Sequence, residues 1–290
     1  MIVSASYRTD IPAFHAAWFA RRLEAGWVEV RNPYGGPPGR VSLKAEDVEG
    51  FIFWTRNARP FLPQLEQVAA REIPFVVQYT MTGHPSRLDG GTPPPDQALT
   101  VMEEIARTHG SDRVVWRYDP IVFSDQTPKS VHRETFARLA DRVAGRALAN
   151  EVVVSVLQPY KKAARRLDKL HDLAWCDPQV EEKQALLRDL ADLAAERGLR
   201  LSLCAQPELL VPGVVEAACI DAARLSRIAG RPIAPKAKPH RPACACVQSR
   251  DIGAYDTCAH GCVYCYAVNG QERARRLVAE QDPKSPRLGP

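Results

Sequence analysis

Six short apolar runs, separated by segments with helical punctuation, constrain the fold of this chain more than any other feature. They are IVSAS (2–6), FIFWT (51–55), PFVVQYT (74–80), RVVWRYDP (113–120), EVVVSVL (151–157) and LRLSLCA (199–205). Each run is almost continuously hydrophobic, which predicts a strand of a parallel sheet with both faces covered. Because the strands alternate with helices, the sequence predicts an α/β fold: a (β/α) barrel, or an open, six-stranded, partial TIM-like barrel.

The segments between these runs carry the start and stop signals of helices. We expect helices over residues 13–25, 58–71, 95–109, 129–144, 159–172 and 221–228. Asp177 and Pro178 predict the start of a further helix, and Gly198 its end. Residues 27–33 and 41–43, on either side of a Gly/Pro loop, predict a small hairpin.

The chain divides into three expected parts. Residues 1–230 form the barrel core, and 231–270 a Pro-rich linker with a cysteine-rich, cluster-binding extension. The prolines from Pro232 to Pro242 exclude a helix there, so the linker is expected to be extended. Residues 271–290 are expected to form a C-terminal helix to about Glu280 and a disordered tail.

Composition limits the class of protein. No run of the 290 residues approaches the roughly 18 apolar residues that cross a bilayer, and the amino terminus lacks a signal-peptide pattern. The sequence therefore predicts a cytoplasmic protein without a membrane partner. In a reducing compartment, its eight cysteines are expected to be metal ligands rather than disulfides.

The formal net charge of +5 is modest. Part of it flanks the cysteine-rich segment, at Lys236, Lys238, Arg241, Arg250, Arg273, Arg275 and Arg276. Nucleic-acid binding is permitted but not indicated, since such a stretch is more often a solvated surface.

Three cysteines, Cys258, Cys262 and Cys265, stand at CxxxCxxC spacing with Tyr264 before the last. Three thiolates on one loop can hold three irons of a 4Fe-4S cluster and leave the fourth open to a small molecule. The same spacing also suits zinc, which would recruit a fourth ligand such as His260 or another cysteine.

Four further cysteines, Cys204, Cys219, Cys244 and Cys246, make up the number needed for a second, fully ligated iron-sulfur cluster or a structural zinc. The alternative is that Cys204 and Cys219 are small buried hydrophobic residues. Cys176 has no partner at metal-binding spacing and is expected to pack.

Polar side chains gather where the predicted strands end. They include Ser4, Ser6, Arg8, Asp10, Trp54, Thr55, Arg56, Asn57, Gln78, Thr80, Thr82, Arg117, Tyr118, Asp119, Ser155, Gln158 and Gln206. Because loops at the carboxyl ends of parallel strands converge on one mouth, these groups are expected to share a site. Arg8 and Arg117 suit a carboxylate, and Asp10 and Asp119 suit an ammonium group, a ribose hydroxyl or a proton. The structural alternatives are a helix cap at Asp10, a turn at Asp119, and ion pairs between these charges.

The cysteine spacing with Tyr264 resembles the radical S-adenosylmethionine (radical SAM) signature, although the motif in that superfamily follows the first strand of the core. The whole chain resembles the domain of unknown function 1848 family. The resemblance rests on SASYRTDIP (4–12), FWTRN (53–57), WRYDP (116–120) and IGAYDTCAHGCVYCYA (252–267).

The radical SAM resemblance implies a 4Fe-4S cluster on Cys258, Cys262 and Cys265, S-adenosylmethionine at its open iron, an unknown substrate, and an external electron donor such as flavodoxin or ferredoxin. Catalytic roles are then expected for Arg8, Asp10, Arg117 and Asp119, and cofactor-binding roles for Tyr264, Ser6 and Gln158. No GGE-like segment follows a strand, and Gly90 and Gly91 are expected to be plain loop.

The sequence leaves two other classes of function open. One is a zinc- or cluster-stabilised binding module whose basic linker contacts nucleic acid. The other is a metal-dependent barrel hydrolase, which is disfavoured because the strand ends lack an evident set of His and carboxylate ligands.

Overall fold

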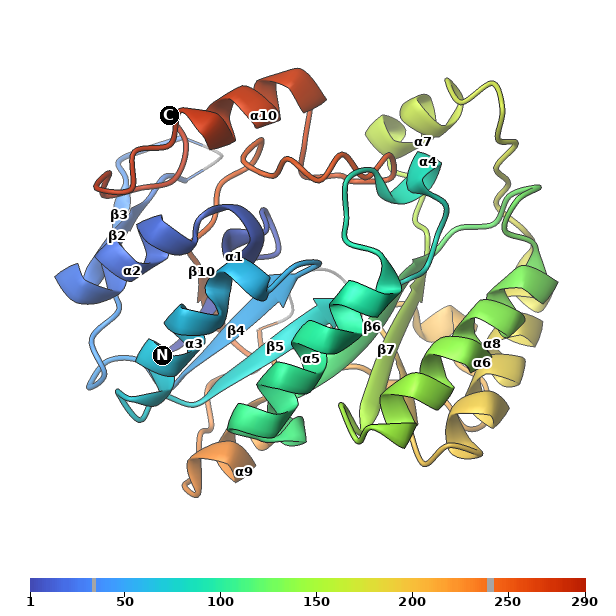
Figure 1. Ribbon diagram of the computed structural model, residues 1–290, viewed down its shortest axis with the longest axis horizontal. Coiled ribbons are helices and arrows are strands. Elements are labelled where there is room, and N and C mark those ends of the chain that lie inside the picture. Colours follow the sequence, from blue (N-terminus) through green and yellow to red (C-terminus); the bar gives the residue numbers. More distant parts are fainter. Residues whose placement is uncertain (33–34, 239–242) are drawn as a thin grey trace.

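A computed structural model describes residues 1–32, 35–238 and 243–290. Its main feature is a sheet of eight parallel strands in the order β10-β1-β4-β5-β6-β7-β8-β9 (Figure 1). The strands are β1 (Ile2–Ala5), β4 (Gly50–Thr55), β5 (Phe75–Thr80), β6 (Val114–Ile121), β7 (Glu151–Val156), β8 (Arg200–Leu203), β9 (Val215–Glu216) and β10 (Ser249–Asp251).

All six predicted strands are confirmed, and β9 and β10 are additional. The predicted hairpin is confirmed as β2 (Trp27–Val30) and β3 (Gly39–Ser42), which pair antiparallel; Pro33 lies outside the described residues. Between the described strands no pairing joins β9 to β10, so the sheet is open and the closed barrel is not confirmed.

The helices follow the sequence signals closely. They are α1 (Ile11–Phe14), α2 (Ala16–Ala25), α3 (Leu62–Ala69), α4 (Ser86–Asp89), α5 (Pro95–His109), α6 (Lys129–Gly145), α7 (Lys161–Leu167), α8 (Val180–Ala195), α9 (Ala222–Ala229) and α10 (Gln271–Ala279). The helix expected over 13–25 is broken at His15, and α7 is shorter than expected. None of these helices is long and apolar enough to cross a membrane.

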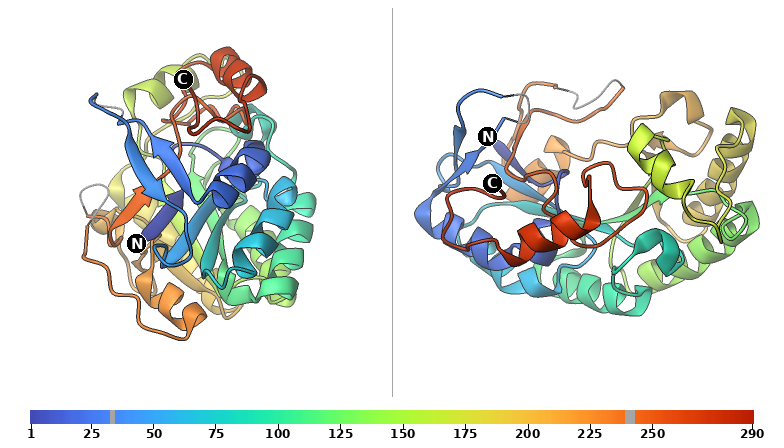
Figure 2. Two further views of the ribbon diagram at one scale, coloured as in Figure 1. Left: turned by 90° about the vertical axis from the view of Figure 1, so that its left-hand side faces the viewer. Right: turned by 90° about the horizontal axis from the view of Figure 1, so that it is seen from above.

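The two faces of the sheet pack against different parts of the chain. Alternate residues such as Val77 and Trp116 contact the layer of helices α2, α3, α5, α6 and α8 (Figure 1). Their neighbours Val76 and Val115 contact the chain that returns after β8, including Leu225 of α9. Seen from above, the helices follow the outside of a curved sheet (Figure 2). Burial on both faces explains why the strand sequences are continuously apolar.

The last ten residues do not match the expected disordered tail. Trp18 Nε1 donates to the carbonyl oxygen of Ser285 at 3.0 Å, and the Glu29 amide donates to that of Pro286 at 2.8 Å. Arg287 pairs with Glu29 at 2.7 Å, and Leu288 is buried. The tail is therefore held mainly by hydrogen bonds to its backbone carbonyl oxygens. Its polar, Pro-rich sequence gives no sign of these bonds, because they do not depend on its side chains.

Candidate functional site: a cysteine-lined cavity at the strand ends

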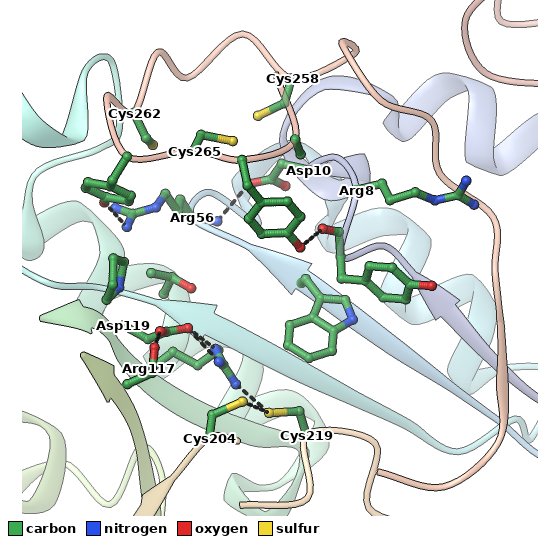
Figure 3. A pocket seen from close by; sticks show the side chains of 18 of the residues that line it. Arg8, Asp10, Arg56, Arg117, Asp119, Cys204, Cys219, Cys258, Cys262 and Cys265 are labelled. Carbon is green, nitrogen blue, oxygen red and sulfur yellow. Dashed lines mark hydrogen bonds and ion pairs between the residues drawn. The ribbon is translucent and has the colours of Figure 1, made fainter. Parts of the chain in front are cut away.

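A cavity of about 490 Å³ lies at the carboxyl ends of the strands. Every residue expected to have a catalytic, cofactor-binding or metal-ligating role lines it: Ser6, Arg8, Asp10, Arg117, Asp119, Gln158, Cys204, Cys219, Cys244, Cys246, Cys258, Cys262, Tyr264 and Cys265. Of the other strand-end residues, Trp54, Thr55, Arg56, Thr80, Ser155 and Gln206 also line it, whereas Ser4, Asn57, Gln78, Thr82 and Tyr118 do not. Figure 3 shows the three motif cysteines on a loop above the cavity, and Cys204 and Cys219 below the Arg117–Asp119 pair. The structure thus brings together residues that are up to 259 positions apart, between Ser6 and Cys265.

The motif loop reaches the cavity because of β10. This strand pairs in parallel with β1, with Ile2 opposite Ser249 and Ser4 opposite Asp251. The chain therefore leaves β10 at the same edge of the sheet as it leaves every other parallel strand. The cysteine loop, residues 252–267, follows directly.

Gly90 and Gly91 lie in a turn, as expected, but the sequence did not predict that the cysteine loop packs against them. The Gly91 amide donates to the His260 carbonyl oxygen at 2.6 Å. Gly90 has φ +63°, and a Cβ atom there would lie 2.4 Å from the same oxygen. Only a glycine allows this approach of two backbones. The Val263 amide also donates to the Leu88 carbonyl oxygen at 2.9 Å.

A buried polar network holds Tyr264 beneath the loop. Arg56 and Asp89 form an ion pair at 3.2 Å, and the Tyr264 hydroxyl accepts from Arg56 and donates to Asp89. Thr82 Oγ1 donates to the other Asp89 oxygen at 2.6 Å. Burial alone would raise the pKa of Asp89, but Arg56, His84 and these hydrogen bonds lower it below its ordinary value. Asp89 was missed from the sequence because no motif marks it.

Asp10 has two structural roles. Its Oδ1 caps α1 by accepting from the Ala13 amide at 2.9 Å, as the structural alternative predicted. Its Oδ2 lies 2.8 Å from His260 Nε2 and also accepts from the Arg56 amide at 2.8 Å. Asp10 therefore connects the first loop of the sheet to the cysteine loop.

Arg8 and Ser6 are tied to the end of β10. Arg8 Nε donates to Asp251 Oδ1 at 2.8 Å, and its Nη2 donates to the Asp251 carbonyl oxygen at 3.1 Å. Ser6 Oγ lies 2.8 Å from the same carboxylate. Arg8 is thus held in a structural ion pair, but its partner is Asp251 and not Asp10 or Asp119, which the structural alternative had named. Asp251 carried no sequence signal beyond standing shortly before the cysteine motif.

Arg117 and Asp119 form the polar centre of the cavity. Arg117 Nη2 lies 2.5 Å from Asp119 Oδ2, and Nη1 donates to Gln78 at 3.2 Å and to Cys219 Sγ at 3.0 Å. Ser155 donates to the second Asp119 oxygen. The Asp119 side chain keeps 21% of its surface exposed, against 5% for Arg117.

The four remaining cavity cysteines also lie close together. Cys204 Sγ and Cys219 Sγ are 3.4 Å apart, and the Ile220 amide donates to Cys246 Sγ at 3.3 Å. Thiol hydrogen bonds connect Cys219 to Cys246 and Cys246 to Cys244. The hydrogen bond with Cys204 lowers the pKa of Cys219, but the one with Cys246 and burial outweigh it and raise that pKa to about 11.

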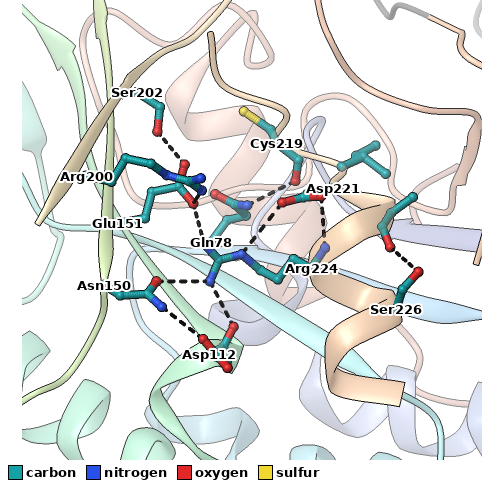
Figure 4. Close-up of polar contacts among 12 residues, drawn as sticks. Gln78, Asp112, Asn150, Glu151, Arg200, Ser202, Cys219, Asp221, Arg224 and Ser226 are labelled. Carbon is teal, nitrogen blue, oxygen red and sulfur yellow. Dashed lines mark hydrogen bonds and ion pairs between the residues drawn. The ribbon is translucent and has the colours of Figure 1, made fainter. Parts of the chain in front are cut away.

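The wall of this cavity is anchored at the opposite end of the strands (Figure 4). Arg224 of α9 is buried, donates to the Asp112 carbonyl oxygen at 3.0 Å, and pairs with Glu151 at the start of β7. Glu151 also accepts from Arg200 at 2.9 Å and from Ser202. Burial raises the pKa of Glu151, but these partners outweigh it and hold the pKa below its ordinary value.

The fold and the cavity define an α/β protein with an open parallel sheet and a polar, cysteine-lined site at its carboxyl edge. The family model described as domain of unknown function (DUF1848) matches residues 2–267, and the chain belongs to that family. No curated protein matches it. Among solved structures, a putative alpha-L-fucosidase from Bacteroides thetaiotaomicron is similar at 10% identity, over 88% of this chain and 93% of that chain. Its TM-score of 0.28 is too low to support an argument.

Within the described ranges, no three His, Cys, Asp or Glu side chains are already arranged to hold a metal ion. Both metal assignments therefore remain predictions.

Replacing Gly90 by alanine should loosen the cysteine loop. The added Cβ would meet the His260 carbonyl oxygen at 2.4 Å, at a positive φ that alanine disfavours. We expect a loss of about 2 kcal/mol in the free energy of unfolding and faster hydrogen exchange over residues 258–267. Gly145→Ala is the control, because nothing lies within 4 Å of its Cβ position. Unchanged exchange in the Gly90 variant would contradict this docking role.

Arg224→Met should destabilise the protein by about 3 kcal/mol, because it leaves Glu151 with only part of its charge compensation. Chemical denaturation measures the loss, with the exposed Arg227→Met as control. The Glu151 pKa is lowered in the folded state, so its stabilisation is present above the ordinary glutamate pKa and disappears as pH falls through the folded value. The gap between wild type and variant should therefore shrink in acid. A constant gap would argue against the ion pair.

Proposed function

We propose that this protein is an iron-sulfur enzyme of the radical SAM type. Cys258, Cys262 and Cys265 would hold a 4Fe-4S cluster, and the cavity would bind S-adenosylmethionine and a substrate. When bound, such a cluster supplies the electron for reductive cleavage of S-adenosylmethionine, which generates a radical able to abstract hydrogen from the substrate. The observation that carries the proposal is the position of the cysteine loop, which closes over a cavity lined by the strand-end residues.

The order of the strands supports this proposal despite the late position of the motif. In the radical SAM superfamily the motif follows the first strand of the core. Here it follows β10, the edge strand that pairs in parallel with β1. In space, β10 therefore precedes β1 in the sheet, although it follows β1 in the sequence.

The cysteine loop supplies three thiols, which is the number that holds three irons of a cube, whereas a closed zinc site needs a fourth ligand. His260, the candidate fourth zinc ligand, has its Nε2 2.8 Å from Asp10 and its ring packed on Phe14 at 4.6 Å. Burial raises the pKa of Cys262 to about 12, while the nearby Arg56 guanidinium opposes that rise. A metal would therefore have to displace the proton from this thiol, because metals bind the thiolate form.

The remaining residues would bind and orient rather than react. Arg117 is fixed by Gln78 and Cys219, so it holds Asp119 in place more than it clamps a ligand carboxylate. The partly exposed Asp119 is suited to accept an ammonium group or a ribose hydroxyl. Arg8 and Ser6 would act indirectly by fixing Asp251, and Gln158 and Tyr264 complete the lining.

The binding-module alternative rests on the basic linker. Lys236, Lys238 and Arg250 are exposed, and Arg241 lies outside the described residues. If the protein binds no iron-sulfur cluster, the binding module becomes the preferred function.

Replacing Cys258, Cys262 and Cys265 together by alanine should remove one cluster, about four irons per chain, and abolish 5′-deoxyadenosine formation by the dithionite-reduced protein. Anaerobic iron and sulfide analysis measures the first effect and chromatography the second. Cys176 is exposed and lies outside the cavity, contrary to the expectation that it packs, so Cys176→Ala is the matched control. Full iron content in the triple variant would refute the assignment of the cluster to this loop.

Asp119→Asn should keep the iron content while lowering 5′-deoxyadenosine formation about 100-fold, because a misplaced ligand reacts slowly. Asp192→Asn, on the outer helix α8, is the control. Wild-type rates in the Asp119 variant would exclude it from ligand binding.

A further inference from the structure

We propose that Cys204, Cys219, Cys244 and Cys246 form a second metal centre, a mononuclear zinc site with four thiolate ligands beneath the cavity. The site is separate from the cysteine loop and does not depend on the radical SAM proposal. Its ligands come from three places: the end of β8, the segment after β9, and the CxC pair before β10.

The four thiols meet although they are distant in sequence. Cys204 Sγ and Cys219 Sγ are 3.4 Å apart, and hydrogen bonds continue from Cys219 to Cys246 and from Cys246 to Cys244. In the described residues the four thiols are not yet gathered around one point. Metal binding would gather them around one point by turning the side chains of the CxC pair.

Polar donors reach these sulfurs, although Cys204, Cys219 and Cys246 also pack in a buried apolar cluster with residues such as Val76. Arg117 Nη1 donates to Cys219 Sγ at 3.0 Å, and the Ile220 amide donates to Cys246 Sγ at 3.3 Å. Gln78 Nε2 donates to the Cys219 carbonyl oxygen at 3.0 Å and fixes its backbone. Donors to ligand sulfur and a compensating charge are usual around metal thiolates. Four cysteines that served only as packing would not need a buried guanidinium beside them.

The spacing of the sulfurs favours one metal ion over an iron-sulfur cube. Ligands at the Zn–S distance of about 2.3 Å in a tetrahedron have sulfurs about 3.8 Å apart, close to the 3.4 Å between Cys204 and Cys219. A cube holds its cysteines farther apart, because each binds a different iron. Among the described thiols of the cysteine loop, no such thiol–thiol hydrogen bond is present. This difference fits an iron-sulfur cube on the loop and a single metal ion at the other four cysteines.

The position of the site suggests its purpose. Cys244 and Cys246 stand shortly before β10, the strand that delivers the cysteine loop. A zinc ion that joined them to Cys204 and Cys219 would fix the returning chain to the inner face of the sheet. It would also lie next to Arg117 and so stabilise the Arg117–Asp119 pair from below.

Metal analysis of two complementary variants tests the site. Protein purified and reconstituted without oxygen should contain about one zinc per chain in addition to iron. Cys244→Ser with Cys246→Ser should lose the zinc and keep the iron, whereas the triple alanine variant of the cysteine loop should lose the iron and keep the zinc. Cys176→Ser should lose neither. If the zinc persists without the CxC pair, the proposal is wrong; if iron and sulfide are lost there instead, the site is a cluster and zinc is wrong.

A measurement on the unmodified sequence covers the case in which the CxC variant does not fold. Cells grown with cobalt should yield protein with the strong visible absorption of a tetrahedral cobalt thiolate, and added zinc should abolish it. A mercurial that titrates thiols should release zinc from the ordinary protein in step with loss of about four thiols. Folded protein without zinc, and without cobalt absorption, would overturn the proposal. Failure of the loop cluster alone would leave both zinc results unchanged.

Discussion

The carboxylate of Asp251 connects β10, late in the sequence, to the loop that follows β1, and the site depends on this connection. Asp251 closes β10 and accepts from Ser6 Oγ at 2.8 Å, the Tyr7 amide at 3.1 Å and Arg8 Nε at 2.8 Å, all just after β1. It also accepts from the Gly253 amide at 2.9 Å, at the start of the cysteine loop. Its side chain is only 3% exposed, so these bonds are shielded from water and correspondingly strong. One buried carboxylate therefore sets both the edge of the sheet and the path of the loop.

Charges buried in pairs recur through the molecule. Arg56 with Asp89 supports the cysteine loop, Arg117 with Asp119 divides the two groups of cysteines, and Arg224 with Glu151 anchors the returning chain. Such pairs add little net stability compared with apolar packing, but removing one partner leaves a buried charge that strongly destabilises the folded state. Their contribution is to fix where each segment lies, which a site made from distant segments requires.

The sequence was sufficient for the parts of the fold that depend on continuous apolar runs. It identified the six long strands because each is buried on both faces. It missed β9 and β10, which are only two and three residues long, and β10 reads SRD. Their strand conformation comes from pairing with β8 and β1, so only the tertiary structure specifies it.

For the site, too, the sequence predicted only what a local run of residues specifies. Residues at the ends of predicted strands, such as Arg117 and Asp119, were found because parallel strands bring their carboxyl ends together. Asp89 and Asp251 were not, because each is a single carboxylate in a polar segment. The close approach at Gly90 also could not be predicted, because it involves the backbone of His260, which is far from Gly90 in the sequence.

The place of β10 beside β1 has a consequence for biosynthesis. A ribosome releases β1 long before β10, so one edge of β1 stays unpaired while the strands between them are made. The pocket acquires its lid only after β10 and the loop that follows it have emerged. The complete cavity therefore exists only after synthesis has passed this loop, and a product terminated before β10 would retain most of the sheet without the cysteine loop over its mouth.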